Sequence, residues 1–153
     1  MRVIAFRAVL AEPPAFFEPL EEPVVRAIAI RADQTLEQLH EALRLAFGWA
    51  DPHLYSFWLE GTHWDNEAPE YTAPFEAEGM DKDKLSARTP ISELGLKKGS
   101  KLAYVFDFGD EWRLDLEVVD SWAAEEASYP LLVEAVGMPP PQYPPLDEQE
   151  AEE

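Results

Sequence analysis

Hydrophobic and polar residues alternate with a helical period between residues 35 and 49. Thr35 and Gln38 have the spacing of a capping box at the start of this segment, and Gly48 is placed to end it in the left-handed conformation. The apolar residues between them are three or four positions apart and share one face: Leu36, Leu39, Leu43, Ala46 and Phe47. A single helix cannot bury such a face by itself, so the pattern predicts a sheet on which this helix packs.

Other segments show the two-residue alternation that is typical of strands. They are residues 1–10, 24–31, 54–60, 101–108 and 112–121. The last two have matching apolar faces and predict a hairpin around the Asp107–Glu111 turn. The segment from Thr89 to Gly95 contains a capping residue, a proline at the first helical position and a closing glycine, which predict a short second helix.

Two segments lack a clear period. Residues 60–64 are interpreted as a turn that returns through Thr62 and Trp64 as a second hairpin strand, and residues 65–84 as an irregular, aromatic flap. Residues 129–136 fit either a helix or a strand. We therefore predict an α+β fold in which a β-grasp-like mixed sheet packs on one main helix, with a short second helix and an irregular aromatic insertion. Residues 1–138 form the single domain of this prediction, and residues 139–153 form a proline-rich, acidic, flexible tail.

The composition narrows the possible partners. The 153 residues include 31 acidic and 12 basic side chains, which give a formal charge of −19. Such a charge repels phosphate backbones and anionic membranes, so direct nucleic-acid binding is disfavoured and a basic protein or peptide is the better partner.

No apolar run approaches the roughly 20 residues of a membrane span, and we expect a cytoplasmic protein. The absence of cysteine excludes disulfides and thiolate metal sites, and no cofactor is predicted. The oligomeric state stays open.

The predicted Asp107–Glu111 turn has two chemical interpretations. Asp107 and Asp110, together with His53, offer oxygen and nitrogen ligands of the kind that hold a divalent metal ion. Aspartates in a turn also accept hydrogen bonds from nearby backbone amides, and glycine there supplies unusual backbone angles. We favour the second interpretation, because the spacing is not specific for a metal. No catalytic residue is assigned, and a non-enzymatic role is favoured.

Aromatic residues exceed what one helix and a small sheet need in a core. The chain has 8 Phe, 5 Trp and 5 Tyr. Most should be buried, but we predict that Trp64, Tyr71 and Phe75 border a groove beside the flap, rimmed by carboxylates and suited to a basic peptide. With the residues of the turn, the predicted binding residues are Trp49, His53, Trp64, Tyr71, Phe75, Asp107, Asp110 and Trp112.

Separate blocks of this sequence resemble those of a known family. They are Leu39-His40-Glu41, Ala46-Phe47-Gly48-Trp49, His53-Leu54-Tyr55-Ser56-Phe57 and the segment from Tyr104 to Trp112. In this order they resemble the Ri-plasmid ORF-3-like family of small α+β proteins, whose activity is uncharacterised and some of which are associated with plasmids and mobile elements. Residues 91–102 also resemble the segment that leads into the last strand of ubiquitin-like domains.

The chain departs from the family pattern at two informative places. Leu114 stands where members usually have a histidine, and Tyr129-Pro130-Leu131-Leu132 stands where they often have a Tyr-Pro-x-Cys segment. A family site built on that histidine and cysteine would lack both groups here. The leading hypothesis is a small binding or adaptor module for a protein or peptide. The alternatives are a metal-dependent enzyme centred on His53, Asp107 and Asp110, and an accessory factor for mobile-element DNA.

Overall fold

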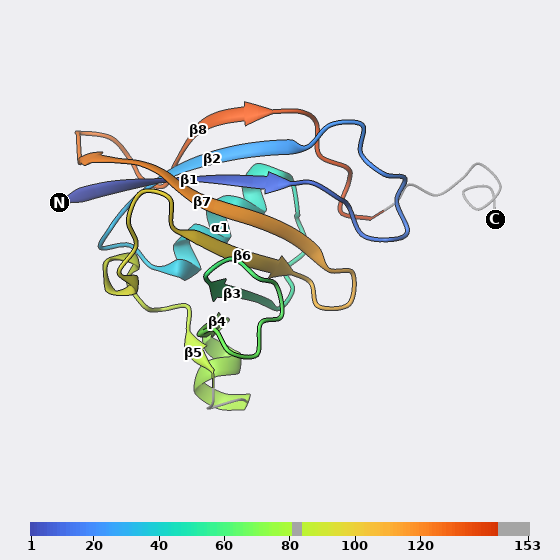
Figure 1. Ribbon diagram of the computed structural model, residues 1–153, viewed down its shortest axis with the longest axis horizontal. Helices are drawn as coiled ribbons and strands as arrows, with labels where there is room; N and C mark the ends of the chain where they lie inside the picture. Colours follow the sequence, from blue (N-terminus) through green and yellow to red (C-terminus); the bar gives the residue numbers. More distant parts are fainter. Residues whose placement is uncertain (81–83, 144–153) are drawn as a thin grey trace.

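The structure is a computed structural model that describes residues 1–80 and 84–143, and within them one eight-stranded sheet carries one α-helix on one face (Figure 1). The order of strands across the sheet is β5-β4-β3-β6-β7-β1-β2-β8. Neighbouring strands are antiparallel except β4 and β5, which are parallel, so the sheet is mixed. The strands are β1 (Arg2–Leu10), β2 (Val24–Arg31), β3 (Tyr55–Leu59), β4 (Glu70–Thr72), β5 (Leu85–Ser86), β6 (Lys101–Phe106), β7 (Trp112–Ala123) and β8 (Leu131–Val136).

Helix α1 (Leu36–Phe47) begins and ends where the sequence predicts. The backbone amide of Gln38 donates to the Thr35 hydroxyl at 3.2 Å, and the amide of Thr35 donates to the Gln38 side chain at 2.9 Å. Gly48 ends the helix with a φ of 80°, which a residue with a Cβ adopts only with strain. Both ends are therefore fixed by local sequence.

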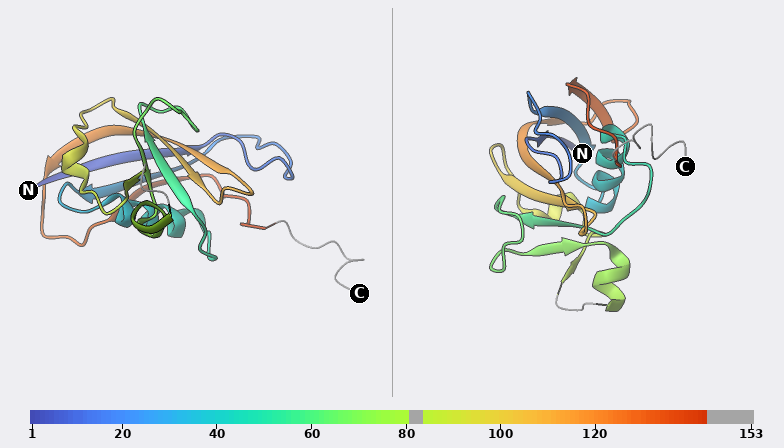
Figure 2. Two further views of the ribbon diagram at one scale, coloured as in Figure 1. Left: turned by 90° about the horizontal axis from the view of Figure 1, so that it is seen from below. Right: turned by 90° about the vertical axis from the view of Figure 1, so that its right-hand side faces the viewer.

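The two faces of the sheet are covered differently. On the face that carries α1, here called the helix face, alternate residues of β6 such as Leu102, Tyr104 and Phe106 enter the main core. On the opposite or outer face a small cluster is buried, made of Trp58, Ala103 and Val105 with Phe108 packed against it. Figure 2 shows α1 lying along one face of the sheet. The helix face therefore holds most of the buried apolar surface.

The predicted α+β class, with a mixed sheet over one main helix and a short second helix, is confirmed. The second helix is the 3₁₀ turn η2 (Ile91–Leu94), which Gly95 closes in the left-handed conformation. The predicted hairpin strand through Thr62 and Trp64 is wrong, because β3 pairs with β4 instead. Trp64 has a φ of 58°, outside the extended region that a strand requires. The insertion between β4 and β5 contains the short helical segment η1 (Glu76–Met80).

The segment after β8 returns to the domain. Gln142 is buried, and its side chain accepts a hydrogen bond from the Asp51 amide and donates one to the Asp51 carbonyl, both at 3.0 Å. Residues 139–143 of the predicted tail thus include a contact with the loop before β3. Residues 144–153 of that prediction, and residues 81–83 of the predicted flap, lie outside the described residues.

Candidate functional site

The turn between β6 and β7 is held by the carboxylate of Asp107. One carboxylate oxygen, Oδ1, accepts hydrogen bonds from the amides of Gly109 at 3.1 Å and Asp110 at 3.2 Å. Asp107 is only 8% exposed and has a φ of 65°. Aspartate tolerates this left-handed conformation better than most residues with a side chain. The contacts are those that the turn interpretation predicts for Asp107.

His53 lies against the same turn. Its Nε2 is 3.4 Å from Oδ2 of Asp107 and 2.9 Å from the hydroxyl oxygen of Tyr143. Burial, and then the nearby Asp107 carboxylate, raise the pKa of Asp110. The structure therefore brings His53, Asp107 and Asp110 to one corner. Within residues 1–80 and 84–143, however, no group of three or more histidine, aspartate and glutamate side chains is arranged to hold a metal ion.

Trp64 reaches this corner from the outer face. Its indole N–H donates to Oε1 of Glu111 at 2.7 Å, and its ring lies 5.2 Å from that of Phe108 and 5.0 Å from that of Trp58. Arg113 donates to the same Glu111 oxygen at 2.8 Å. The hydrogen bonds from Arg113 and Trp64 both lower the pKa of Glu111, and the one from Arg113 has the larger effect. Trp64 is therefore an exposed aromatic residue fixed beside the acidic turn.

The other predicted aromatic residues are elsewhere. Trp49 and Trp112 are 1% and 0% exposed, and their rings lie 5.4 Å apart in the main core. Tyr71 is paired in register with Phe57 and packs against the core on the helix face. Phe75 is 73% exposed beyond β4. The structure therefore does not bring Trp64, Tyr71 and Phe75 into one groove, because the sheet separates Trp64 from Tyr71.

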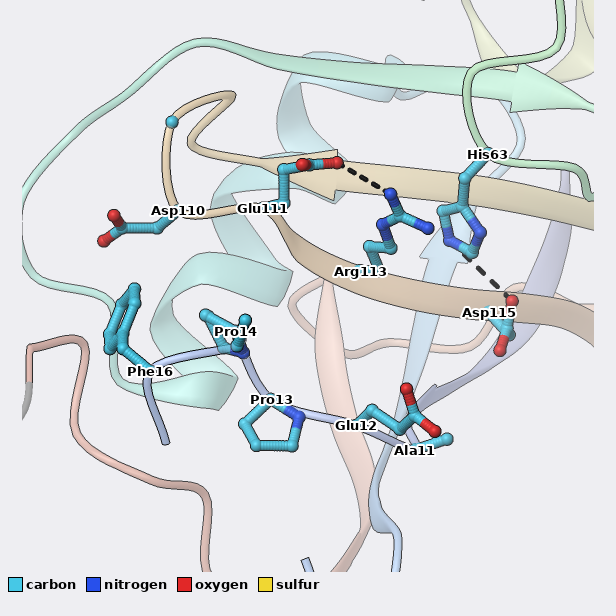
Figure 3. A pocket seen from close by; sticks show the side chains of 12 residues that line it. Ala11, Glu12, Pro13, Pro14, Phe16, His63, Asp110, Glu111, Arg113 and Asp115 are labelled. Carbon is cyan, nitrogen blue, oxygen red and sulfur yellow. Dashed lines mark hydrogen bonds and ion pairs between the residues drawn. The ribbon is translucent and has the colours of Figure 1, made fainter. Parts of the chain in front are cut away.

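A groove that the sequence did not predict lies between the β1–β2 loop and the start of β7 (Figure 3). Its volume is about 500 Å³. We call it the acidic groove, because most of its charged groups are carboxylates. It is lined by Ala11, Glu12, Pro13, Pro14, Ala15, Phe16, His63, Gly109, Asp110, Glu111, Arg113 and Asp115.

The walls of the acidic groove come from distant parts of the chain. Figure 3 shows Glu12 and Phe16 on the β1–β2 loop, across from Asp110 and Glu111 on the turn. The loop reaches this place because β1 pairs with β7 in antiparallel register, with Val9 opposite Asp115. The sequence did not predict that this loop lies beside the turn, since strand pairing of this kind leaves no local signal.

His63 lines the groove above Asp115 (Figure 3). Its Nε2 is 3.0 Å from the carbonyl oxygen of Leu114 and 3.8 Å from a carboxylate oxygen of Asp115. The sequence placed His63 in a hairpin, whereas the structure places it over β7. The neighbour of Asp115 is therefore His63, which carries a positive charge only when it is protonated.

The third histidine, His40, belongs to the core. Its Nδ1 is 2.8 Å from the Tyr104 hydroxyl, and its ring stacks on that of Tyr55 at 3.5 Å between centroids. Burial lowers the pKa of His40 to about 4, so it is neutral at neutral pH. This residue stabilises the packing of α1 on the sheet.

Comparison with known proteins identifies the family. Residues 17–143 match the family model described as plasmid pRiA4b ORF-3-like protein. The chain belongs to this family. The resemblance that the sequence blocks predicted is thereby confirmed, and the match extends from the β1–β2 loop to Tyr143.

Two similar proteins show how far this family assignment reaches. The chain is 30% identical over 125 residues to the uncharacterized protein y4hQ of Sinorhizobium fredii. The aligned region covers 79% of this chain and 59% of y4hQ. The chain thus spans less than two-thirds of that relative. A crystal structure of a protein of unknown function from Methanosarcina mazei Go1 matches with a TM-score of 0.71 and 18% identity, over 92% of this chain and 72% of the other. This similarity shows a shared fold.

Within the described residues, the structure contains no helix long and apolar enough to cross a membrane.

Proposed function

We propose that this protein is a binding module that takes a lysine- or arginine-rich segment of a partner protein in the acidic groove. The observation that carries the proposal is the charge of the groove lining. Glu12, Asp110, Glu111 and Asp115 supply four carboxylates, and Arg113 supplies one guanidinium. Since Arg113 already pairs with Glu111 at 2.8 Å, a cationic ligand meets the three other carboxylates.

The composition of the lining also suits a basic peptide. Charged side chains lie beside the apolar surface of a proline-rich loop, so the groove can contact both the charged ends and the aliphatic stems of lysine and arginine. Phe16 is half exposed and offers an aromatic ring to an arginine side chain. The overall charge of −19 attracts a cationic partner before contact and accelerates its association.

The proposal is tested by isothermal titration calorimetry at low salt with an arginine- and lysine-rich peptide. We expect binding to wild type, and at least about tenfold weaker binding to the triple variant Glu12→Gln/Asp110→Asn/Asp115→Asn, because it loses three of the four carboxylates of the groove. The control is Glu37→Gln/Glu93→Gln/Glu125→Gln, which changes the net charge equally at residues that do not line the groove. It should bind like wild type.

Two results contradict the proposal. Equal weakening of both triple variants would show that the peptide responds to net charge and not to the groove. Absence of binding to wild type at low salt would exclude the cationic peptide altogether.

Duplex DNA in the same titration should not bind, because its phosphates are repelled. Binding of DNA would favour the mobile-element alternative instead.

A further inference from the structure

Strand β8 forms one edge of the sheet as described (Figure 1). Its apolar residues are exposed. Leu131, Leu132, Val133 and Val136 are between 43% and 49% exposed, and Met138 after the strand is 87% exposed. An edge strand also directs a row of backbone N–H and C=O groups outward, where another strand can pair with them.

The other edge of the sheet is protected in the usual way, but β8 is not. Strand β5 has two residues, and a very short edge strand offers little to pair with. Strand β8 has six residues, and its one charged residue, Glu134, lies 3.5 Å from the Arg7 guanidinium. Charges and prolines normally discourage edge pairing. The β8 edge therefore has the length and the neutrality that pairing requires.

Strand β8 is also held in a fixed position. It pairs with β2 over residues 131–136, and the guanidinium of Arg26 donates to the carbonyls of Val136 at 3.1 Å and Gly137 at 3.0 Å. Arg26 itself is 8% exposed and anchored to the Ala46 carbonyl at the end of α1. A partner strand thus meets a preformed edge and orders little on binding.

We propose that this edge pairs with the β8 strand of a second copy, antiparallel and about a two-fold axis, so that two sheets become one. Antiparallel pairing of a strand with itself is symmetric, as a two-fold dimer requires. The strand itself favours a second copy over a cationic partner. Its one charged residue, Glu134, is already paired with Arg7, so two antiparallel β8 strands meet through apolar side chains and offer a cationic partner no unpaired carboxylate along the strand.

The first test measures molecular mass by sedimentation equilibrium over a concentration series. One strand pair with its flanking side chains is a small interface, so we expect a dimer that forms only at high protein concentration. Raising the salt concentration should strengthen it, because salt screens the repulsion between two acidic chains. A monomer at every protein concentration and salt concentration would overturn the proposal.

The second test locates the contact. The chain has no cysteine, so a single introduced thiol is unique. We expect Val133→Cys, near the middle of β8, to form a disulfide-linked dimer under mild oxidation, since residues near a two-fold axis in paired strands approach within disulfide distance. Phe75→Cys, exposed beyond β4, is the control and should stay monomeric. Equal cross-linking of both variants would contradict the proposed contact.

A third variant separates pairing from general hydrophobic association. Leu132→Lys introduces a charge at the edge and should abolish the dimer, although it also lowers the net negative charge that keeps copies apart. Phe75→Lys makes the same charge change elsewhere and should leave the dimer unchanged. Both positions are exposed, so both variants should fold, which circular dichroism checks. A dimer that survives Leu132→Lys would overturn the proposal.

Discussion

The tryptophans on the two faces of the sheet differ in what surrounds them. On the helix face Trp49 and Trp112 are enclosed by the core, and neither indole N–H has a hydrogen-bond partner in the described part of the chain. On the outer face Trp64 is 38% exposed, and its N–H donates to Glu111. The same residue type thus fills the core on one face and borders a charged turn on the other.

This difference shows that aromatic content alone does not locate a binding surface. Successive side chains of a strand point to opposite faces of the sheet, so the face on which a residue lies depends on its position in the strand and on how that strand is paired. Phe57 and Trp58 are adjacent in sequence, yet one lies in the main core and the other in the outer cluster. A surface becomes a candidate site when a charged group accompanies the exposed ring, as Glu111 accompanies Trp64.

Replacement of core and surface tryptophans tests this comparison with the largest expected effect. Trp112→Ala should lower the free energy of unfolding by about 3–5 kcal/mol, because it leaves a cavity in the main core. Trp64→Ala should lower it by about 1 kcal/mol, since the ring is partly exposed. Urea denaturation measures both. Equal losses would show that the two faces are not packed differently.

The buried histidine makes the stability of the helix face depend on pH. Because the pKa of His40 is about 4 when folded and near 6.5 when unfolded, the unfolded chain binds more protons between these values. Stability from this residue is full above pH 6.5 and falls as the pH drops toward 4. The loss should reach about 2 kcal/mol at pH 5.

The variant His40→Gln isolates this contribution. It retains the remaining histidines, His53 and His63, and all carboxylates, so the wild-type and variant unfolding free energies can be subtracted at each pH. Their difference should change by about 2 kcal/mol between pH 7 and pH 5. A constant difference would contradict the neutral, buried state of His40.

The turn residue Asp107 should contribute less than a core residue. Asp107→Ala removes the acceptor for two amides and places alanine at a φ of 65°, which together should cost about 2 kcal/mol. Asp107→Asn keeps an oxygen acceptor and tolerates that backbone conformation, so its cost should stay below about 1 kcal/mol. Thermal unfolding measures the two. A similar cost for both would exclude the proposed role in the turn.

The smallest effect is expected for Asp110, which faces the groove. Its raised pKa reflects partial burial and the neighbouring Asp107 carboxylate, so its charge is unfavourable for the folded state at neutral pH. Asp110→Asn should therefore leave stability within about 0.5 kcal/mol of wild type, with any change toward greater stability. A marked destabilisation in the same unfolding assay would indicate a structural role instead.

The helix and most strands could be predicted from the sequence more readily than the acidic groove, for a physical reason. The capping box at Thr35 and the left-handed Gly48 are local signals, and both ends of α1 were predicted from them. The acidic groove joins Glu12 to Asp115 through the pairing of β1 with β7, and the contact of Tyr143 with His53 joins residues 90 positions apart. Such contacts depend on tertiary arrangement and cannot be read from periodicity.

The predicted hairpin at Thr62 failed for a related reason. The prediction returned the strand of residues 54–60 through a tight turn, but Glu60 and Trp64 both adopt positive φ, and β3 takes its partner from residues 70–72. Packing of Trp64 on Trp58 and its bond to Glu111 decide this path. Both interactions involve residues that the local pattern does not relate.

Amide chemical-shift mapping of the labelled protein with an arginine- and lysine-rich peptide tests the central claim most directly. We predict that the shifts concentrate on residues 11–16, His63 and residues 109–115, with Trp64 at their margin. Residues of α1 and the β4–β5 insertion should change little. Shifts spread over all acidic surfaces, or centred on Tyr71 and Phe75, would contradict the assignment of binding to the acidic groove.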